Sequence, residues 1–157
     1  MLRERQDNGN PPIIISCNFS RDSLTDPQLA ERLGEIVQNY QVPPSMLNLE
    51  IRQTILRREG ISLLQTLREL KEKGFLLSLD YVGFGYTPLH NYRGLEIDYL
   101  KFDRSFLSDL SDKRTVAIFE EMIEKSHSVG TKVVCEGVEG KETAQILKKM
   151  GCDVMQG

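Results

Sequence analysis

The feature that most constrains the fold is an apolar run, Leu76–Leu79, that ends at the carboxylate of Asp80 and continues into a glycine-containing loop. The run is too short for a typical helix and is bounded by Gly74 and Gly83, so it predicts a strand buried on both faces. Such a strand would deliver Asp80 to a functional site. In the alternative interpretation, Asp80 only caps a turn after a core strand.

The same event recurs along the chain, because five further apolar runs also close on a polar or charged residue. The closing residues are Asn18, Glu50, Lys101, Glu136 and Gln156. Stretches with helical apolar spacing lie between the runs, which predicts repeated βα units around a parallel sheet. Parallel strands end at one edge, and in a βα barrel that edge holds the active site. We therefore expect the six closing residues to converge there.

Amphipathic spacing places four helices between these strands. The first begins after Thr25-Asp26-Pro27, and the others run from about Ile61 to Lys73, from near Asp112 to Gly130 and from Gly140 to Met150. His127 falls on the last turn of the third helix, where a partial positive charge suits the helix dipole, and is assigned no chemistry. His90 lies in the link from Tyr86 to Leu95 and is expected to make exposed polar contacts.

The length of 157 residues is that of one domain with a real core. Six predicted strands are fewer than the eight of a closed barrel, which usually takes ~250 residues. The predicted fold class is therefore α/β, an incomplete TIM-like (βα) barrel of about six units. Residues 1–12 form a polar N-terminal segment and residues 13–157 the barrel domain. Both ends are interpreted as points of truncation.

Composition and charge limit the classes of function that this chain can have. The net charge is −3 and no basic stripe is visible, which excludes a footprint for duplex nucleic acid and leaves room for a small phosphate ligand. Cys17, Cys135 and Cys152 lie inside predicted strands and are interpreted as small core residues in a reducing compartment, in preference to a thiolate metal site. No apolar run is long enough for a membrane span, so a cytoplasmic location is expected, with membrane tethering of a longer parent left open.

Three of the closing residues suggest a metal site. Asn18, Glu50 and Asp80 all carry oxygen donors, which hard ions such as Mg²⁺ or Mn²⁺ accept. Lys101 adds a charge partner and Glu136 a candidate base. One such residue at a strand end is weak support, but five in order are much stronger.

The chain resembles the EAL domain family, the cyclic di-GMP phosphodiesterases of bacterial signalling. The motifs that carry the resemblance are Cys17-Asn18-Phe19-Ser20, Leu47-Asn48-Leu49-Glu50-Ile51, Leu79-Asp80-Tyr81-Val82-Gly83-Phe84-Gly85-Tyr86, Leu100-Lys101-Phe102-Asp103, Glu136-Gly137-Val138-Glu139 and Gly151-Cys152-Asp153-Val154-Met155-Gln156-Gly157. They cover nearly everything after residue 13, in order. The resemblance implies a modified βα barrel with metal ions at the strand ends and cyclic di-GMP across its mouth.

The resemblance also implies roles for individual residues. Asn18, Glu50 and Asp80 match metal ligands, and Lys101 and Glu136 match groups near the attacking water. Gln156 matches a ligand-contacting position, and Asp103 and Glu139, in the same motifs, are taken as further ligand-binding positions. Such a site hydrolyses one phosphodiester bond to leave the linear dinucleotide pGpG. Two neighbouring ions would stabilise the attacking and the departing oxygen.

The chain departs from the family pattern at several places. The strand with the Glu-Ala-Leu signature, which supplies a further metal ligand and a phosphate-binding arginine, is absent from these 157 residues. Tyr81 stands where the family has a second aspartate, and a phenol cannot replace a bridging carboxylate near pH 7. Gln53 replaces a glutamate that braces the following loop, and Phe84 replaces the loop threonine. We therefore expect one bound ion or none.

Three functions follow from these observations. The first is a degenerate, non-hydrolytic member that binds cyclic di-GMP weakly or binds a protein partner. The second is a working metal-dependent phosphodiesterase whose missing strand belongs to a longer chain, and the third is a purely structural dimerisation or spacer element. Tyr81 favours the first over the second, and Asn18, Glu50, Lys101 and Glu136 argue against the third. Other signalling domains are expected in a longer parent chain, and self-association is expected at the unpaired edge of the first strand.

Overall fold

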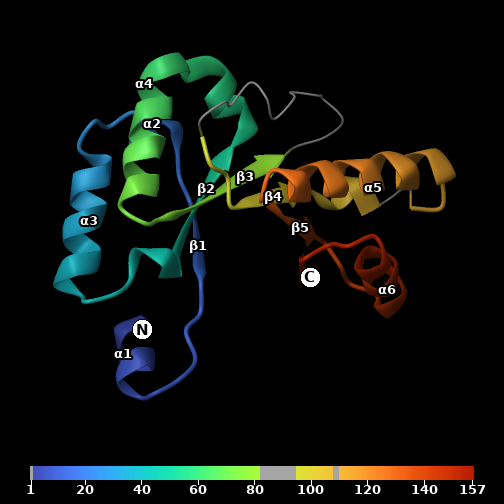
Figure 1. The fold of residues 1–157 in the computed structure, drawn as a ribbon, viewed down its shortest axis with the longest axis horizontal. Coiled ribbons are helices and arrows are strands. Elements are labelled where there is room, and N and C mark those ends of the chain that lie inside the picture. Colours follow the sequence, from blue (N-terminus) through green and yellow to red (C-terminus); the bar gives the residue numbers. More distant parts are fainter. Residues whose placement is uncertain (1, 82–94, 108–109) are drawn as a thin grey trace. The chain divides into compact units, whose positions relative to one another are not determined.

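A computed structural model describes residues 2–81, 95–107 and 110–157 (Figure 1). The chain divides into two compact units. The described residues of the first unit are 2–78 and 95–96, and those of the second are 79–81, 97–107 and 110–157. The predicted glycine loop after Tyr81, with Phe84, and the predicted contacts of His90 lie outside the described residues.

The first unit alternates strands and helices. Its elements are α1 (Leu2–Asp7), β1 (Ile15–Asn18), α2 (Arg21–Leu24), α3 (Leu29–Asn39), the 3₁₀ turn η1 (Pro44–Met46), β2 (Leu47–Arg52), α4 (Gln53–Glu72) and the first half of β3 (Leu76–Tyr81). Strand order follows chain order, β1-β2-β3, and β1 pairs with β2 in parallel with Asn18 opposite Glu50. The parallel βα arrangement that the sequence predicts is therefore present in this unit.

The second unit repeats the pattern. It holds the rest of β3 and then β4 (Tyr99–Phe102), the 3₁₀ turn η3 (Arg104–Leu107), α5 (Lys113–Ser128), β5 (Lys132–Glu136), α6 (Lys141–Lys149) and β6 (Val154–Gln156). Strand order is again chain order, β4-β5-β6, and both pairings are parallel. Lys101 lies opposite Val134, and Glu136 lies opposite Gln156.

Local sequence explains where the helices begin and end. Asp112 caps α5 by accepting a hydrogen bond from the Thr115 N–H at 3.1 Å, and Ser20 caps α2 by accepting from Ser23 N–H at 3.2 Å. Gly74, with φ of +89°, follows the end of α4, because glycine adopts the left-handed conformation that ends a helix without a Cβ penalty. These signals mark the starts of α2 and α5 and the end of α4.

Alternate strand residues divide into two sets, because successive side chains point to opposite faces. One set is apolar and packs under the helices, which gives each unit its own core. In the first unit it includes Leu49, Ile51 and Leu77, with Leu63, Leu67 and Leu70 of α4. In the second it includes Leu100, Phe102 and Val133, with Phe106, Phe119 and Ile123. The other set contains Asn48, Glu50, Ser78, Lys101 and Glu136.

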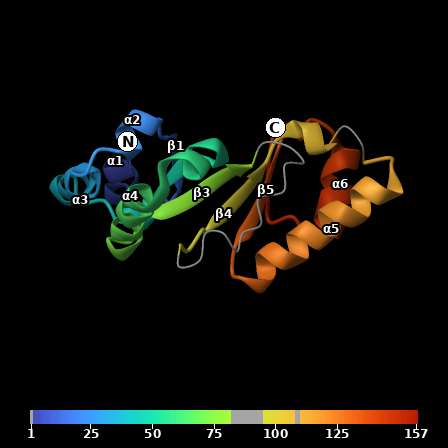
Figure 2. The same cartoon turned by 90° about the horizontal axis from the view of Figure 1, so that it is seen from above.

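Each unit has helices that pack against its own elements. In the first unit α4 contacts β2, α2 and α3, and in the second α5 packs along β5 (Figure 2). The rings of Phe102, Phe106 and Phe119 form one cluster under α5, with Phe102 edge-on to both others at 4.9 Å between ring centroids. All three rings are buried, so the cluster is part of the core of the second unit.

Several expectations differ from the structure. Helix α4 begins at Gln53, well before Ile61, because the strand turns directly into a helix without a proline or capping residue to mark the start. Most residues of β1 are exposed, Cys17 among them, so the interpretation of Cys17 as a core residue is wrong. Leu2–Asp7, part of the predicted polar segment, forms helix α1.

None of the helices in the described part of the chain has the length and apolar content that a bilayer crossing requires.

Candidate functional site

In the first unit, two predicted site residues lie side by side at the strand ends. Asn18 is the last residue of β1 and is exposed, and its register partner Glu50 on β2 is only 8% exposed. The Phe19 N–H donates to the Glu50 carbonyl at 3.0 Å, which continues the strand pairing one step beyond Asn18. Two oxygen-donor side chains are thus held at neighbouring positions of one sheet edge.

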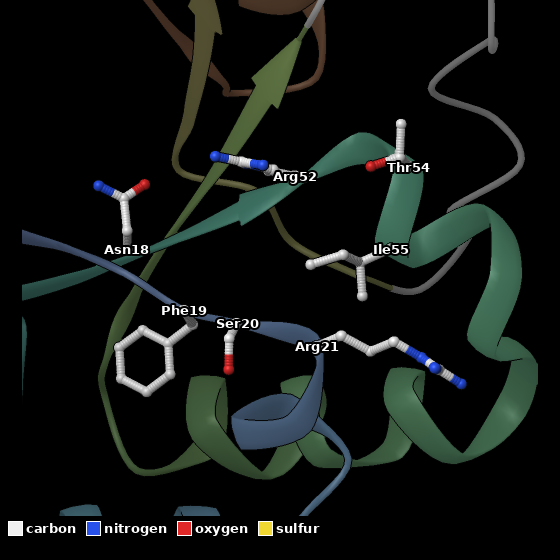
Figure 3. A pocket seen from close by; sticks show the side chains of 7 residues that line it. All are labelled: Asn18, Phe19, Ser20, Arg21, Arg52, Thr54 and Ile55. Carbon is white, nitrogen blue, oxygen red and sulfur yellow. The ribbon is translucent and has the colours of Figure 1, made fainter.

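A cavity of about 500 Å³ opens beside Asn18 (Figure 3). The residues that line it are Asn18, Phe19, Ser20, Arg21, Arg52, Thr54 and Ile55. The side chain of Arg52 extends from the end of β2 toward Asn18, whereas that of Arg21 points away from both. These seven described lining residues include two guanidinium groups and no carboxylate. Electrostatically, the cavity favours an anion.

Arg52 lies where β2 passes into α4. It occupies the N-cap position of α4, and its side chain makes no capping hydrogen bond. The first N–H groups of a helix have no partners within the helix and carry a partial positive charge. The guanidinium and the start of α4 therefore add positive potential beside Asn18. No motif in the sequence points to Arg52; the available signal is an arginine two residues after Glu50, directly at a strand end.

Beneath Asn18 and Glu50 lies a polar layer that the sequence analysis also missed. Asn48 Nδ2 donates to Ser16 Oγ at 2.8 Å and to Ser78 Oγ at 2.6 Å, so one amide links β1, β2 and β3. Asn48 is buried, and its Oδ1 has no hydrogen-bond partner within the described chain. Each of the three residues lies two positions before a predicted site residue on the same strand. The layer thus supports the strand ends from below.

Gln53, expected from the resemblance to stand in place of a bracing glutamate, is the first residue of α4. It is 6% exposed, and its Nε2 donor has no partner that the structure describes. A buried donor without a partner is costly, so the position is suited to an acceptor.

In the second unit, Lys101 and Glu136 form an ion pair. Lys101 Nζ lies 2.5 Å from Glu136 Oε1, and the side chains are 7% and 31% exposed respectively. Gln156 is the register partner of Glu136 and is exposed. The candidate catalytic pair and one candidate ligand-binding residue are therefore together at the ends of β4, β5 and β6. Asp80, half-buried on β3, belongs to the same unit.

The other two predicted ligand-binding residues differ from each other. Asp103 follows β4 and is half-buried; its Oδ1 accepts from the Ser105 N–H at 2.9 Å. Hydrogen bonds from Ser105 and the nearby charge of Arg104 hold the pKa of Asp103 below its usual range despite some burial. Asp103 thus has a local role at the start of η3. Glu139 is exposed in the turn after β5.

That turn is shaped by Gly137, the residue after Glu136. Its φ is +74°, and a Cβ at this position would lie 2.5 Å from the Arg104 Cβ. Only glycine fits both the conformation and the close approach. The backbone after Glu136 is therefore fixed against the segment that follows Lys101.

The described residues fit a metal ion only in part. They contain no group of three or more His, Cys, Asp or Glu side chains arranged to hold one. Asn18 and Glu50 supply two neighbouring oxygen donors in the first unit, and Asp80, the third predicted ligand, lies in the second. Carboxylate and amide oxygens suit Mg²⁺ or Mn²⁺, with water filling the remaining positions.

The family model for the EAL domain matches residues 1–157. The chain is 35% identical over 154 residues to an uncharacterized protein of Azorhizobium caulinodans, which covers 98% of this chain and 21% of that protein. It is 28% identical to the cyclic di-GMP phosphodiesterase PA2567 of Pseudomonas aeruginosa, over 94% of this chain and 25% of that protein. The chain thus spans about a quarter or less of these relatives.

A solved structure of the PaMucR phosphodiesterase in complex with c-di-GMP matches 99% of this chain and 63% of that chain. The TM-score is 0.88 and the sequence identity is 28%. This likeness confirms the predicted fold class, an α/β fold that forms part of a TIM-like barrel.

Proposed function

The chain belongs to the EAL domain family of cyclic di-GMP signalling, and from this premise we propose that it binds cyclic di-GMP without hydrolysing it. The observation that carries the proposal is the cavity beside Asn18, to which Arg52 and the start of α4 give positive potential. Its volume lies in the range of small-molecule sites. A phosphodiester is the anionic group of this ligand, and a guanidinium recognises it through paired hydrogen bonds.

Asn18 and Glu50 are the proposed metal ligands of the first unit, and Asp80 is a proposed metal ligand of the second. When bound, Mg²⁺ or Mn²⁺ would polarise a phosphate oxygen and lower the pKa of a water. Tyr81 stands where the family has a second aspartate, and its phenol is neutral near pH 7. The charge that would hold a second ion is therefore missing, and with it the paired stabilisation of attacking and leaving oxygens. This loss supports binding without turnover.

Lys101 and Glu136 keep their pairing in this proposal. The 2.5 Å contact holds the Glu136 carboxylate beside the ammonium at the strand ends, and only in the hydrolytic alternative would this carboxylate accept a proton from the attacking water. Gln156, opposite Glu136, can donate to or accept from the ligand. We also propose that Asp103 and Glu139 contact the ligand.

The test is a calorimetric titration of the 157-residue chain with cyclic di-GMP, with and without Mg²⁺ or Mn²⁺, followed by chromatography for pGpG. We expect binding without product. Arg52→Ala removes a charged hydrogen bond worth about 1.5–3 kcal/mol, so it should weaken binding roughly 10- to 100-fold. Arg32→Ala is the matched control, because Arg32 is an exposed arginine of the same unit that pairs with Asp26 outside the cavity.

The alternatives give different results. Turnover that Glu50→Ala abolishes would identify a metal-dependent phosphodiesterase. No binding of cyclic di-GMP by a folded chain would leave only the structural or protein-interaction role.

We further propose that the domain self-associates through the edge of β1, in the cytoplasm, and within a longer signalling protein. Strand β1 is the first strand of its sheet, and most of its residues are exposed. Ile14, next to it, is 50% exposed. Among the described strands, β1 is at the edge of the sheet, and this edge beside an exposed isoleucine supports pairing with a second copy.

A further inference from the structure

Two buried cysteines in the second unit lie in direct contact. The sulfurs of Cys135, on β5, and Cys152, in the turn before β6, are 3.2 Å apart. The Cys152 thiol also lies 3.1 Å from the Val154 carbonyl, so its sulfur is held in place. A disulfide bond is about 2.0 Å long, so the sulfurs need to approach by only about 1.2 Å.

The two thiols differ in their exposure to solvent. Cys135 is fully buried, whereas Cys152 is 8% exposed, so an oxidant reaches Cys152 first. The Cys152 thiol donates to the Cys135 sulfur. Once Cys152 loses its proton, the Cys135 thiol can donate in return, which lowers the pKa of Cys152 and raises that of Cys135. A low-pKa thiol beside a resolving thiol is the arrangement found in redox-sensing pairs.

We propose that Cys135 and Cys152 are a reversible oxidation site that forms an intramolecular disulfide with a peroxide. The Cys152 thiolate attacks one peroxide oxygen, the O–O bond breaks, and hydroxide leaves, which oxidises Cys152 to a sulfenic acid. The Cys135 sulfur then attacks the sulfenic sulfur, the S–O bond breaks, and water leaves. In sum, two thiols and one hydrogen peroxide give one disulfide and two waters.

The disulfide would act on the proposed binding edge through the backbone. Cys135 directly precedes Glu136, and β6, which carries Gln156, starts shortly after Cys152. The bond would tie β5 to the approach of β6 across 17 positions of sequence, closing a loop around α6. Because loop closure restricts the unfolded chain, the oxidised protein should be more stable.

The test is hydrogen peroxide treatment of the 157-residue chain, then alkylation of remaining thiols and non-reducing tryptic mapping. Trypsin places the three cysteines in separate peptides, 6–21, 133–141 and 150–157, so each thiol can be followed. We expect peptides 133–141 and 150–157 to appear as one linked species, about 2 Da lighter than their sum. Thermal unfolding should shift upward by about 5–10 °C and return with dithiothreitol.

Cys17 is the internal control, because it is an exposed thiol in the other unit that meets the same oxidant. Cys17→Ser should leave the linked species unchanged, and Cys152→Ser should abolish it. Since the mapping uses the natural residues, it does not depend on the variants folding. If Cys152 accumulates as sulfinic acid, or if the linkage involves Cys17 instead, the proposal is wrong. None of these outcomes depends on cyclic di-GMP binding.

Discussion

Removing Glu136 from its ion pair with Lys101 should lower the free energy of unfolding more than removing Lys101 does. Glu136→Gln leaves a 7% exposed ammonium facing a neutral amide, and water cannot readily replace the lost carboxylate. Lys101→Met leaves the carboxylate of Glu136, which is 31% exposed and can be solvated, while methionine fills the space of the lysine stem.

The size of each loss in unfolding free energy depends on how buried the remaining partner is. Breaking a fully buried pair from one side costs about 3–5 kcal/mol, and breaking an exposed pair costs about 0–1 kcal/mol. Because Glu136 is about one third exposed, we expect about 2–3 kcal/mol for Glu136→Gln and about 1 kcal/mol for Lys101→Met. The free energy of unfolding in urea at pH 7.5 measures both, and far-ultraviolet circular dichroism checks the fold.

The order of the two losses is the decisive result. If Lys101→Met destabilises the protein more than Glu136→Gln, the buried ammonium is not the group that needs the pair. The matched control is Lys125→Met, whose ion pair with Glu121 is exposed on α5, and we expect it to cost less than either.

Three further predictions concern the core, acid stability and assembly. Phe119→Ala should lower the free energy of unfolding by about 3–5 kcal/mol, since it opens a cavity in the aromatic cluster, while Ile118→Ala, at a 41% exposed position, should cost well under half of that. Burial raises the pKa of Asp153, but hydrogen bonds with the Val133 N–H and the His127 ring outweigh it and hold that pKa below its usual range. The stabilisation by Asp153 is therefore present above about pH 4 and is lost as the pH falls further. Asp153→Asn should flatten that part of a plot of unfolding free energy against pH. Sedimentation velocity should show concentration-dependent dimers that Ile14→Lys weakens, and a monomer at all concentrations for the unaltered chain would contradict pairing at β1.

The strands could be predicted because each is an apolar run that stops at a polar residue. Asn18 and Glu136 are the last residues of β1 and β5, as that pattern predicts, whereas β2 continues two residues beyond Glu50 to Arg52. Register pairing then brings Asn18 beside Glu50. The family was also predicted correctly from the motifs. The proposed roles of the site residues stay predictions.

The features that could not be predicted from the sequence are contacts between segments far apart in the chain. Asn48 looked like part of an apolar strand, but the register places it between two serines from other strands. Arg52 had no assigned role in the sequence, and the turn into α4 places it beside a cavity. His127 received no role, yet its Nε2 lies 2.8 Å from Asp153 Oδ2 across 26 positions of sequence. No periodicity encodes such pairs.

Because side chains alternate along a strand, selection for stability and selection for ligand chemistry act on different residues of the same segment. In β2, Leu49 and Ile51 pack under the helices, while Asn48 and Glu50 point to the other face. A lineage can therefore exchange the polar set, and with it the chemistry, while the apolar set continues to specify the barrel. The same division gives protein engineers a rule: randomise the even-numbered positions of β2 to search for new ligands, and keep the odd-numbered ones unchanged.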